Sequence, residues 1–333
     1  MTATLSSSPP AASGLAIFAK IVVALTFVLI LIGGHTTTSN AGMAFPDWPL
    51  SNGSLNPEGW WTNFMMRLEH GHRLTAGLVA TLISVLMVWV WRGRKQLPRG
   101  TVPLAAIALL GVLSQAVLGG LRVKLDSNGV ATATTFRVLH ACVAQIELCV
   151  LVALAATLSP AWKKITPSSG QSVIAKMGRV AVAFVFLQLL AGATMRHLGA
   201  GLAIPTFPRS TAEGGWMPSV HNAYIDLNFT HTRFGAIVVT LLLLHFATSA
   251  MRKSGGDPLI IRPSILLCVL ILGQFLIGMF VIWHVRPPLL TTLHVVNGAA
   301  VLATTVLLTR RATRATMKCE SSTDSVSFAP IHG

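Results

Sequence analysis

The chain has 333 residues, of which 53% are hydrophobic and only 11% are charged, and its formal net charge is +15. A soluble domain of this length does not need so large an apolar fraction for its core, so the composition indicates an integral membrane protein. A nucleic-acid-binding protein would need a basic soluble domain with aromatic residues, and the apolar segments leave no room for one. We therefore expect the lipid bilayer, and no nucleic acid, as a partner.

Eight apolar segments are long enough to cross a bilayer, because a membrane-spanning helix needs about 20 predominantly apolar residues. They cover residues 15–34, 71–91, 102–122, 136–158, 177–195, 230–250, 264–283 and 290–309. The expected fold class is an all-α integral membrane protein with eight transmembrane helices. Residues 1–14 are expected to form a disordered N-terminal tail, and residues 310–333 a C-terminal tail.

Lys and Arg residues mark the cytoplasmic loops of membrane proteins, and here they cluster after every even-numbered span. The clusters comprise Arg92, Arg94, Lys95 and Arg99, then Lys163, Lys164 and Lys176, then Arg252, Lys253 and Arg262, and finally Arg310, Arg311, Arg314 and Lys318. Both termini are therefore expected in the cytoplasm, with segments 35–69 and 196–229 outside.

The sequence repeats itself at an offset of 159 residues. AGMAFPDWP at 41–49 is matched by AGLAIPTFP at 200–208, and glycines in the first and third spans match those in the fifth and seventh. This pattern predicts two side-by-side four-helix bundles, at 15–160 and 177–309, joined by a cytoplasmic linker at 161–176. Because each copy has four spans, the repeat is parallel, with both copies entering the membrane in the same direction. Cleavage of the first span as a signal peptide is the alternative, which its counterpart in the fifth span argues against.

Histidines were duplicated with the spans. The offset places His72 on His231, and the last spans of the two copies match at His140 and His294. Each bundle thus carries two histidines near its outer surface, on its second and fourth helices. Two facing imidazoles in a bundle core are a way to hold a flat metalloporphyrin by both axial positions. For any single one of these histidines, a hydrogen-bonding role between helices is the alternative.

Charged residues near these histidines differ between the copies. Glu69 lies three residues before His72, so that both point to one helix face, and its counterpart is Asn228. This difference suggests proton-coupled chemistry in the first bundle, although a carboxylate favoured by the helix dipole is the alternative. Glu147 is a further candidate as an acid within a span. Four arginines near the outer surface are candidates to pair with porphyrin propionates, namely Arg73, Arg137, Arg196 and Arg233.

Several motifs together resemble the haem A synthase family. They are EHGHRLTAG at 69–77, LSQAVLGGL at 113–121, LAGATMRHLGAGLAIPTFP at 190–208, AGMAFPDWP at 41–49 and the last-span histidines. The resemblance runs from about residue 15 to 309. It implies two four-helix bundles in a bacterial cytoplasmic membrane, the first receiving haem O and the second keeping a haem b.

The resemblance also implies an activity, which is oxidation of a porphyrin ring methyl of haem O to a formyl group by successive hydroxylations. His72 and His140 would flank the substrate haem, and His231 and His294 would ligate the cofactor haem. Glu69 matches the family position implicated in turnover. The partners implied are a haem O synthase, cytochrome oxidase assembly factors and an unidentified electron acceptor.

Three departures from the family pattern affect individual residues. Thr37 stands where many members have an arginine, and the His-Arg pair becomes His231-Thr232-Arg233, which moves Arg233 around the helix. The outer segments lack the cysteine pair of some members, so no thiol relay is expected there. A di-haem electron-transfer protein that oxidises a quinol is the alternative function, and a transporter is a more distant one because no paired breaks interrupt the spans.

The two matched Pro-rich segments just outside the first and fifth spans are expected to fold over their own bundles as lids. Proline restricts the backbone, and an aromatic side chain such as Trp48 or Phe207 gives a rigid apolar surface. An interfacial aromatic anchor is the alternative.

Overall fold

The computed structural model describes residues 10–128 and 132–327. The helices in chain order are α1 (Pro10–Thr38), α2 (Phe64–Gly93), α3 (Thr101–Ser127), α4 (Ala133–Leu158), α5 (Ala161–Lys164), α6 (Gln171–His197), the 3-10 turn η1 (Ala200–Leu202), α7 (Ala223–Phe229), the π-helical turn η2 (Thr230–Gly235), α8 (Ala236–Arg252), α9 (Pro258–Trp283) and α10 (Pro288–Ser327). The described residues are helical apart from loops and one isolated β-bridge. The all-α prediction is confirmed.

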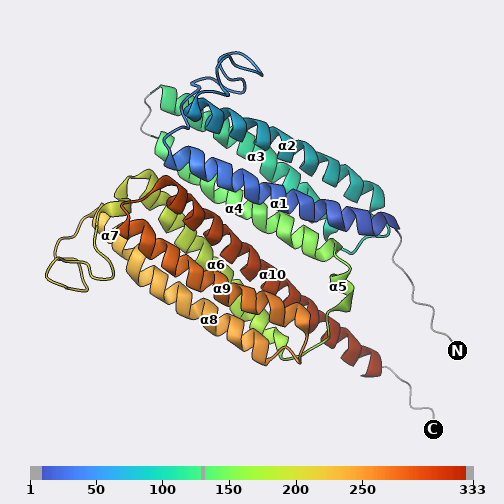
Figure 1. The fold of residues 1–333 in the computed structure, drawn as a ribbon. Helices are drawn as coiled ribbons and strands as arrows, with labels where there is room; N and C mark the ends of the chain where they lie inside the picture. The colour runs from blue at the N-terminus through green and yellow to red at the C-terminus, as the bar shows by residue number, and fades with distance from the viewer. Residues whose placement is uncertain (1–9, 129–131, 328–333) are drawn as a thin grey trace, which may run out of the picture.

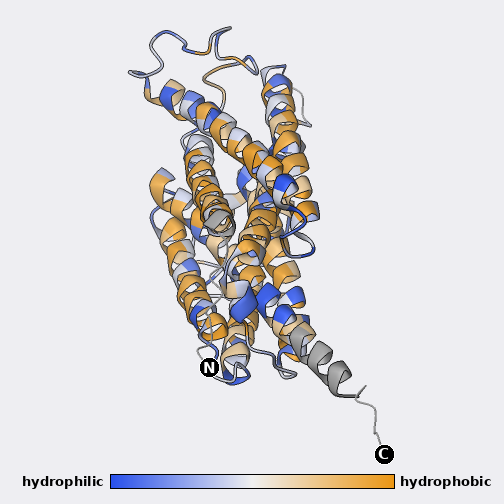
Figure 2. Cartoon of the chain, turned by 90° about the vertical axis from the view of Figure 1, so that its right-hand side faces the viewer, coloured by the Kyte–Doolittle hydropathy of each residue, from blue (hydrophilic) through white to orange (hydrophobic). Residues whose placement is uncertain are grey.

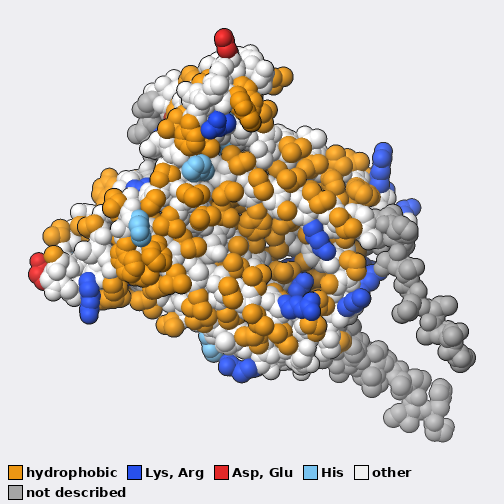
Figure 3. All heavy atoms as spheres, viewed as in Figure 1, with side chains coloured by type: hydrophobic (Ala, Val, Ile, Leu, Met, Phe, Trp, Pro, Cys, Tyr) orange, Lys and Arg blue, Asp and Glu red, His pale blue; other side chains and the backbone are white. Residues whose placement is uncertain are grey.

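Eight helices are long and apolar enough to cross a membrane, with α7, η2 and α8 forming one continuous span. This confirms the predicted number, and the chain is a multi-pass membrane protein. The surface agrees, because hydrophobic residues run along the helices and cover most of the visible face, whereas many of the Lys, Arg and acidic side chains lie toward the two ends (Figures 2 and 3).

The predicted bounds differ from the observed ones mainly at the polar ends of helices. Helix α2 begins at Phe64, well before residue 71, because the Asn63 side chain caps the N–H groups of Met65 and Met66. The apolar run of span length starts later because Arg67, Glu69 and His70 interrupt it, although Phe64, Met65 and Met66 are apolar. Helix α1 already begins at Pro10 and α10 continues to Ser327, so parts of both expected tails are helical, while residues 1–9 and 328–333 lie outside the described residues. The expected linker at 161–176 contains α5 and the first turn of α6.

The spans form two groups of four side by side (Figure 1). In the first group α1 contacts α2 and α4, and α3 contacts the same two helices; in the second, α6 and α9 each contact α8 and α10. Each group has its own apolar core. Between the groups, α1 packs on α10, α4 packs on α6, and α4 also meets α10. The long loops that follow α1 and α6 lie at one end of the molecule, and α1 begins at the other.

Candidate functional site

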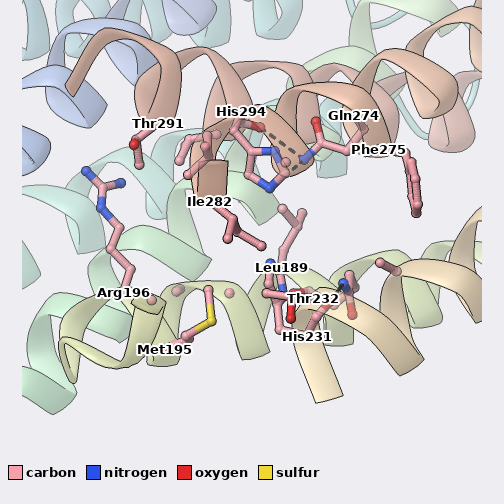
Figure 4. A pocket seen from close by; sticks show the side chains of 18 of the residues that line it. Leu189, Met195, Arg196, His231, Thr232, Gln274, Phe275, Ile282, Thr291 and His294 are labelled. Carbon is pink, nitrogen blue, oxygen red and sulfur yellow. Dashed lines mark hydrogen bonds between the residues drawn. The ribbon is translucent and has the colours of Figure 1, made fainter. Parts of the chain in front are cut away.

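Two histidines face one another across a cavity in the second bundle. His231 comes from the π-helical turn η2 and His294 from α10, and their ring centroids lie 6.4 Å apart with the rings at 81°. Both rings line the cavity between α6, α9 and α10, as Figure 4 shows. Apolar side chains such as Ile282 and Phe275 form its walls, and Arg196 lies toward one end with Thr291. The predicted pair is thus brought together.

His231 keeps a free lone pair for a metal, whereas the lone pair of His294 faces a side-chain amide. Nδ1 of His231 lies 3.1 Å from the Gln188 carbonyl oxygen, to which it donates in the neutral ring, so Nε2 carries the free lone pair. Nε2 of His294 lies 3.2 Å from the Gln274 amide nitrogen, from which it accepts, so a metal bound at Nε2 would take the place of this hydrogen bond; Nδ1 is buried without a partner. A metal–nitrogen bond is about 2 Å long, so rings 6.4 Å apart can hold one ion between them.

Backbone glycines make room for both imidazoles. A Cβ on Gly192 would lie 2.6 Å from Cε1 of His231, and a Cβ on Gly278 would lie 2.9 Å from Cε1 of His294. Because real Cβ contacts at these distances are essentially absent, any larger residue would push the ring aside. The two rings are therefore set against backbone, which fixes their positions from behind.

Glycines back His72 and His140 of the first bundle in a similar way. A Cβ on Gly33 would lie 2.7 Å from Cε1 of His72, and one on Gly119 would lie 3.3 Å from Cε1 of His140. The Nδ1 atoms of both rings are buried without a partner. The Gln115 side chain donates to the His140 carbonyl at 3.1 Å, as Gln274 does to the His294 carbonyl.

Neither pair resembles a closed metal site made by side chains alone. Among the described residues, no group of three or more His, Cys, Asp or Glu side chains could hold a metal ion. An iron between two histidines would therefore need its other ligands from elsewhere, and a porphyrin supplies four nitrogens. The unpaired ring nitrogens, the glycine-backed rings and the apolar cavity fit such a group.

Glu69 and Arg73 on α2 hold the first outer segment, residues 41–50. Oε2 of Glu69 accepts a hydrogen bond from the Phe45 N–H at 3.0 Å, and Oε1 lies 2.6 Å from the Arg73 guanidinium. Arg73 in turn donates to the carbonyls of Phe45, Asp47 and Leu50 at 3.0, 2.8 and 2.5 Å. The carboxylate is buried, and its charge is balanced by the arginine one turn further along.

Asn228 and Arg233 hold the second outer segment, residues 200–209, in the same way. The Asn228 amide donates to the Ala200 carbonyl at 2.8 Å, and Arg233 donates to the carbonyls of Thr206 and Arg209. The extra residue Thr232 was expected to turn the arginine away. It does not, because the wider π-helical turn brings residues five apart onto one face, and Arg233 reaches the Asn228 side chain at 3.3 Å.

Aromatic rings and arginines fasten both outer segments over their own bundles. Trp48 lies against α3 at Gly120, whose Cβ would be 2.7 Å from the indole. Phe207 packs edge-on against Phe275 at 5.9 Å and lines the cavity. These contacts hold each segment against its own bundle, and a lid function stays a prediction.

Two further arginines, which were not among the predicted site residues, contact these segments. Arg122 donates to the Gly42 carbonyl, and Arg286 lies against Gly201, which a Cβ would bring to 3.1 Å of its side chain. Arg286 also lines the cavity. The matched glycines 42 and 201 indicated a close contact at both places. The two arginines are not separated by the repeat offset, so the repeat alone does not reveal them.

The other predicted residues have diverse surroundings. Arg196 lines the cavity and also donates to the Gly34 carbonyl of α1 at 2.7 Å, across the boundary between the bundles. Arg137 forms an ion pair with Asp126 at 2.5 Å. Glu147 is buried against Gly111, and its Oε1 has no partner. His197, the last residue of α6, lines the cavity beside Arg196.

The turn that follows Trp48 is held by Asp47. Its carboxylate accepts hydrogen bonds from the N–H groups of Asn52 and Gly53, both at 2.8 Å. Slight burial works to raise the pKa of this carboxyl, but the backbone donors Gly53 and Asn52 and the nearby Arg73 charge outweigh it and lower the pKa below its usual 3.8. The charged form of Asp47 thus stabilises the turn.

Comparison with known proteins identifies the family. Residues 61–306 match the family model COX15-CtaA, described as cytochrome oxidase assembly protein. The chain belongs to this family. It is also similar to proteins named heme A synthase: 28% identical over 268 residues to that of Shouchella clausii, covering 79% of this chain and 85% of the relative. It is 28% identical over 326 residues to that of Beijerinckia indica, covering 85% and 88%, and 25% identical over 347 residues to that of Rhodopseudomonas palustris, covering 90% of each.

Proposed function

We propose that this protein is a haem A synthase, which oxidises a porphyrin ring methyl of haem O to a formyl group by successive hydroxylations. The family membership and the name shared by its relatives support this activity. The observation that carries the proposal is the pair of glycine-backed histidines in each bundle, both beneath a fastened outer segment. A haem O synthase would supply the substrate.

The second bundle is the proposed site of a resident haem b, with His231 and His294 as axial ligands. This iron would take up and give back one electron at a time. Arg196 and Arg286 lie at the cavity and offer guanidinium groups for the propionates. Arg233, by contrast, has its guanidinium engaged by the second outer segment. Arg233 is therefore not free to bind a propionate as predicted, and it influences the haem site only by setting the position of the second outer segment.

The first bundle is the proposed site of the substrate haem, between His72 and His140. Glu69 lies one helical turn from His72 and is buried, and its carboxylate retains lone pairs beyond the two hydrogen bonds it accepts. We assign it the uptake of protons released during oxidation. Asn228 at the matching place in the second bundle cannot take up a proton, which fits a bundle that only holds its haem.

The two bundles are proposed to be copies of one unit related by an axis along the membrane normal. Matched glycine contacts at His72 and His231 and the reciprocal packing of α1 on α10 and α4 on α6 support this. The basic loops support an orientation with both termini in the cytoplasm of a bacterial cell. The outer segments and both histidine pairs would then lie near the external surface.

Co-expression with a haem O synthase, followed by chromatography of the extracted haems, tests the activity. The proposal requires the formyl haem to appear with this chain and not with the empty vector. Unchanged haem O together with bound haem b would instead support a di-haem electron-transfer protein. The variant Glu69→Gln tests the proton role: it should accumulate unconverted haem O while retaining haem b.

A further inference from the structure

A groove between α6 and α10 lies at the end of the molecule opposite the outer segments. It is lined by Arg179 and Val182 of α6 and by Val306, Thr309 and Arg310 of α10. The two helices approach closely beside it, because Gly178 packs directly against Thr309. The groove therefore has a fixed floor, and it opens between two membrane-spanning helices.

Along this groove, the charged side chains lie near the membrane surface and the apolar side chains lie deeper. Val182 lies one turn further along α6 than Arg179, toward the middle of the span, and Val306 lies one turn before Arg310, again toward the middle. Both helices thus present an arginine near the membrane surface and a valine at greater depth. A ligand that fits must carry negative charge at one end and an apolar chain at the other.

Arg310 is held in place by the neighbouring elements. Its guanidinium donates to the Thr157 hydroxyl of α4 at 3.0 Å and stacks over the Trp162 ring at 5.3 Å. Arg314 stacks over the same ring at 5.7 Å. The Nε atoms of both arginines are buried without a hydrogen-bond partner. Donors are therefore present and oriented, with some of their capacity unused.

No carboxylate whose side chain the structure describes forms an ion pair with these arginines. Among the described residues, the ion pairs are Glu69–Arg73, Asp126–Arg137 and Asp226–His221, all at the other end of the molecule. Asp257 lies at the same end as the groove, but its carboxylate accepts from the N–H groups of Thr166 and Leu259. Arg179 is exposed. Among the described side chains, the two arginines of the groove thus carry positive charge that no carboxylate pairs with.

We propose that this groove binds one anionic phospholipid, with its phosphate on Arg179 and Arg310 and an acyl chain along Val182 and Val306. Guanidinium groups bind phosphate through paired N–H donors, and basic pockets between membrane helices on the cytoplasmic side suit such headgroups. Because Arg310 also contacts α4 and α5, the lipid lies where the two bundles meet.

Native mass spectrometry of the full chain in detergent, titrated with phosphatidylglycerol or phosphatidylcholine, tests the site. We expect one phosphatidylglycerol to be retained and phosphatidylcholine to be lost. Each arginine near a membrane surface contributes about 1 kcal/mol to anionic lipid binding, so Arg179→Gln should weaken binding about fivefold and R179Q/R310Q about thirtyfold. Arg92→Gln removes an exposed charge at the same end of the first bundle and should leave the affinity unchanged.

Further controls separate the alternatives. R179K/R310K keeps both charges and should retain the lipid, and unchanged haem content of each variant shows that it is folded. Equal binding of the two lipids, or an Arg92→Gln loss as large as that of R179Q/R310Q, would overturn the proposal. Displacement of the lipid by inorganic phosphate at equal concentration would also overturn it and would indicate a free-anion site. A change of oligomeric state in R179Q/R310Q would overturn it as well and would indicate an interface between copies.

Discussion

Replacing Gly192 by alanine should displace His231 and release the haem b proposed for the second bundle. The new Cβ would lie 2.6 Å from Cε1, 3.1 Å from Nε2 and 3.2 Å from Nδ1 of the imidazole. Since ordinary contacts begin at 3.4 Å, Cε1 must move by at least about 0.8 Å, and rotation alone does not help because three ring atoms are too close. Metal–ligand distances tolerate only about 0.2 Å. We expect a loss of haem affinity of about 10–100-fold, as for other changes that displace a ligand.

The control for this change is Gly273→Ala in α9 of the same bundle, where a Cβ meets nothing within 4 Å. Alanine is favoured over glycine in a helix by about 1 kcal/mol, so this variant should be at least as stable as the parent and keep its haem. The assay is haem b per polypeptide by pyridine haemochrome, together with the Soret spectrum. If Gly192→Ala carried as much haem b as Gly273→Ala, with the same spectrum, His231 would not be a ligand.

The same comparison in the first bundle should affect a different step. Gly33→Ala places a Cβ 2.7 Å from His72, whereas Gly71→Ala meets nothing within 4 Å. Gly33→Ala should therefore keep haem b and fail to convert haem O in the co-expression assay, while Gly71→Ala converts it normally. Loss of haem b in Gly33→Ala would contradict the assignment of separate sites.

Three further predictions concern the outer segments. In Arg73→Lys, one ammonium group cannot reach the three carbonyls that the guanidinium binds. Protease should then cleave residues 41–55 about tenfold faster, which corresponds to the loss of one charge-assisted hydrogen bond of about 1.5 kcal/mol. An unchanged cleavage rate would refute the fastening role. Deleting Thr232 should convert η2 to an α-helical turn that keeps Arg233 on the same face, with haem b retained; loss of haem b would show that the π-helical turn itself is required. Because the pKa of Asp47 is lowered in the folded protein, its contribution to the stability of the turn is present above about pH 3.8 and is lost as the pH falls through the lower folded pKa. Acid should therefore increase cleavage near Asn52 in the parent protein but not in Asp47→Asn.

Much of the architecture could be predicted because the bilayer imposes a simple rule on sequence. Apolar runs of span length gave the number of helices, since each run must satisfy its backbone within a helix. The start of α2 escaped that rule, because Arg67, Glu69 and His70 interrupt the apolar run while the Asn63 cap begins the helix before them. The helical parts of the expected tails escaped it because residues 10–14 and 310–327 are not apolar runs of span length.

The histidine pairs could be predicted from the repeat, whereas their surroundings could not. The wider turn at Thr232 has no sequence signal beyond an extra residue, and only the backbone shows that Arg233 returns to the face of Asn228. Arg122 and Arg286 occupy matching places under Gly42 and Gly201, but one lies within a helix and the other in the loop after α9. A search at a constant offset cannot find such a pair.

Arg196 lies where a substitution in one bundle affects the other bundle during evolution. Its guanidinium faces the cavity of the second half while it donates to Gly34, next to the glycine behind His72. The methyl of Thr292 would meet any Cβ added at Gly34 at 3.3 Å. A substitution at position 34 is therefore constrained by a residue more than a hundred positions away, and homologous sequences should show position 34 covarying with position 292.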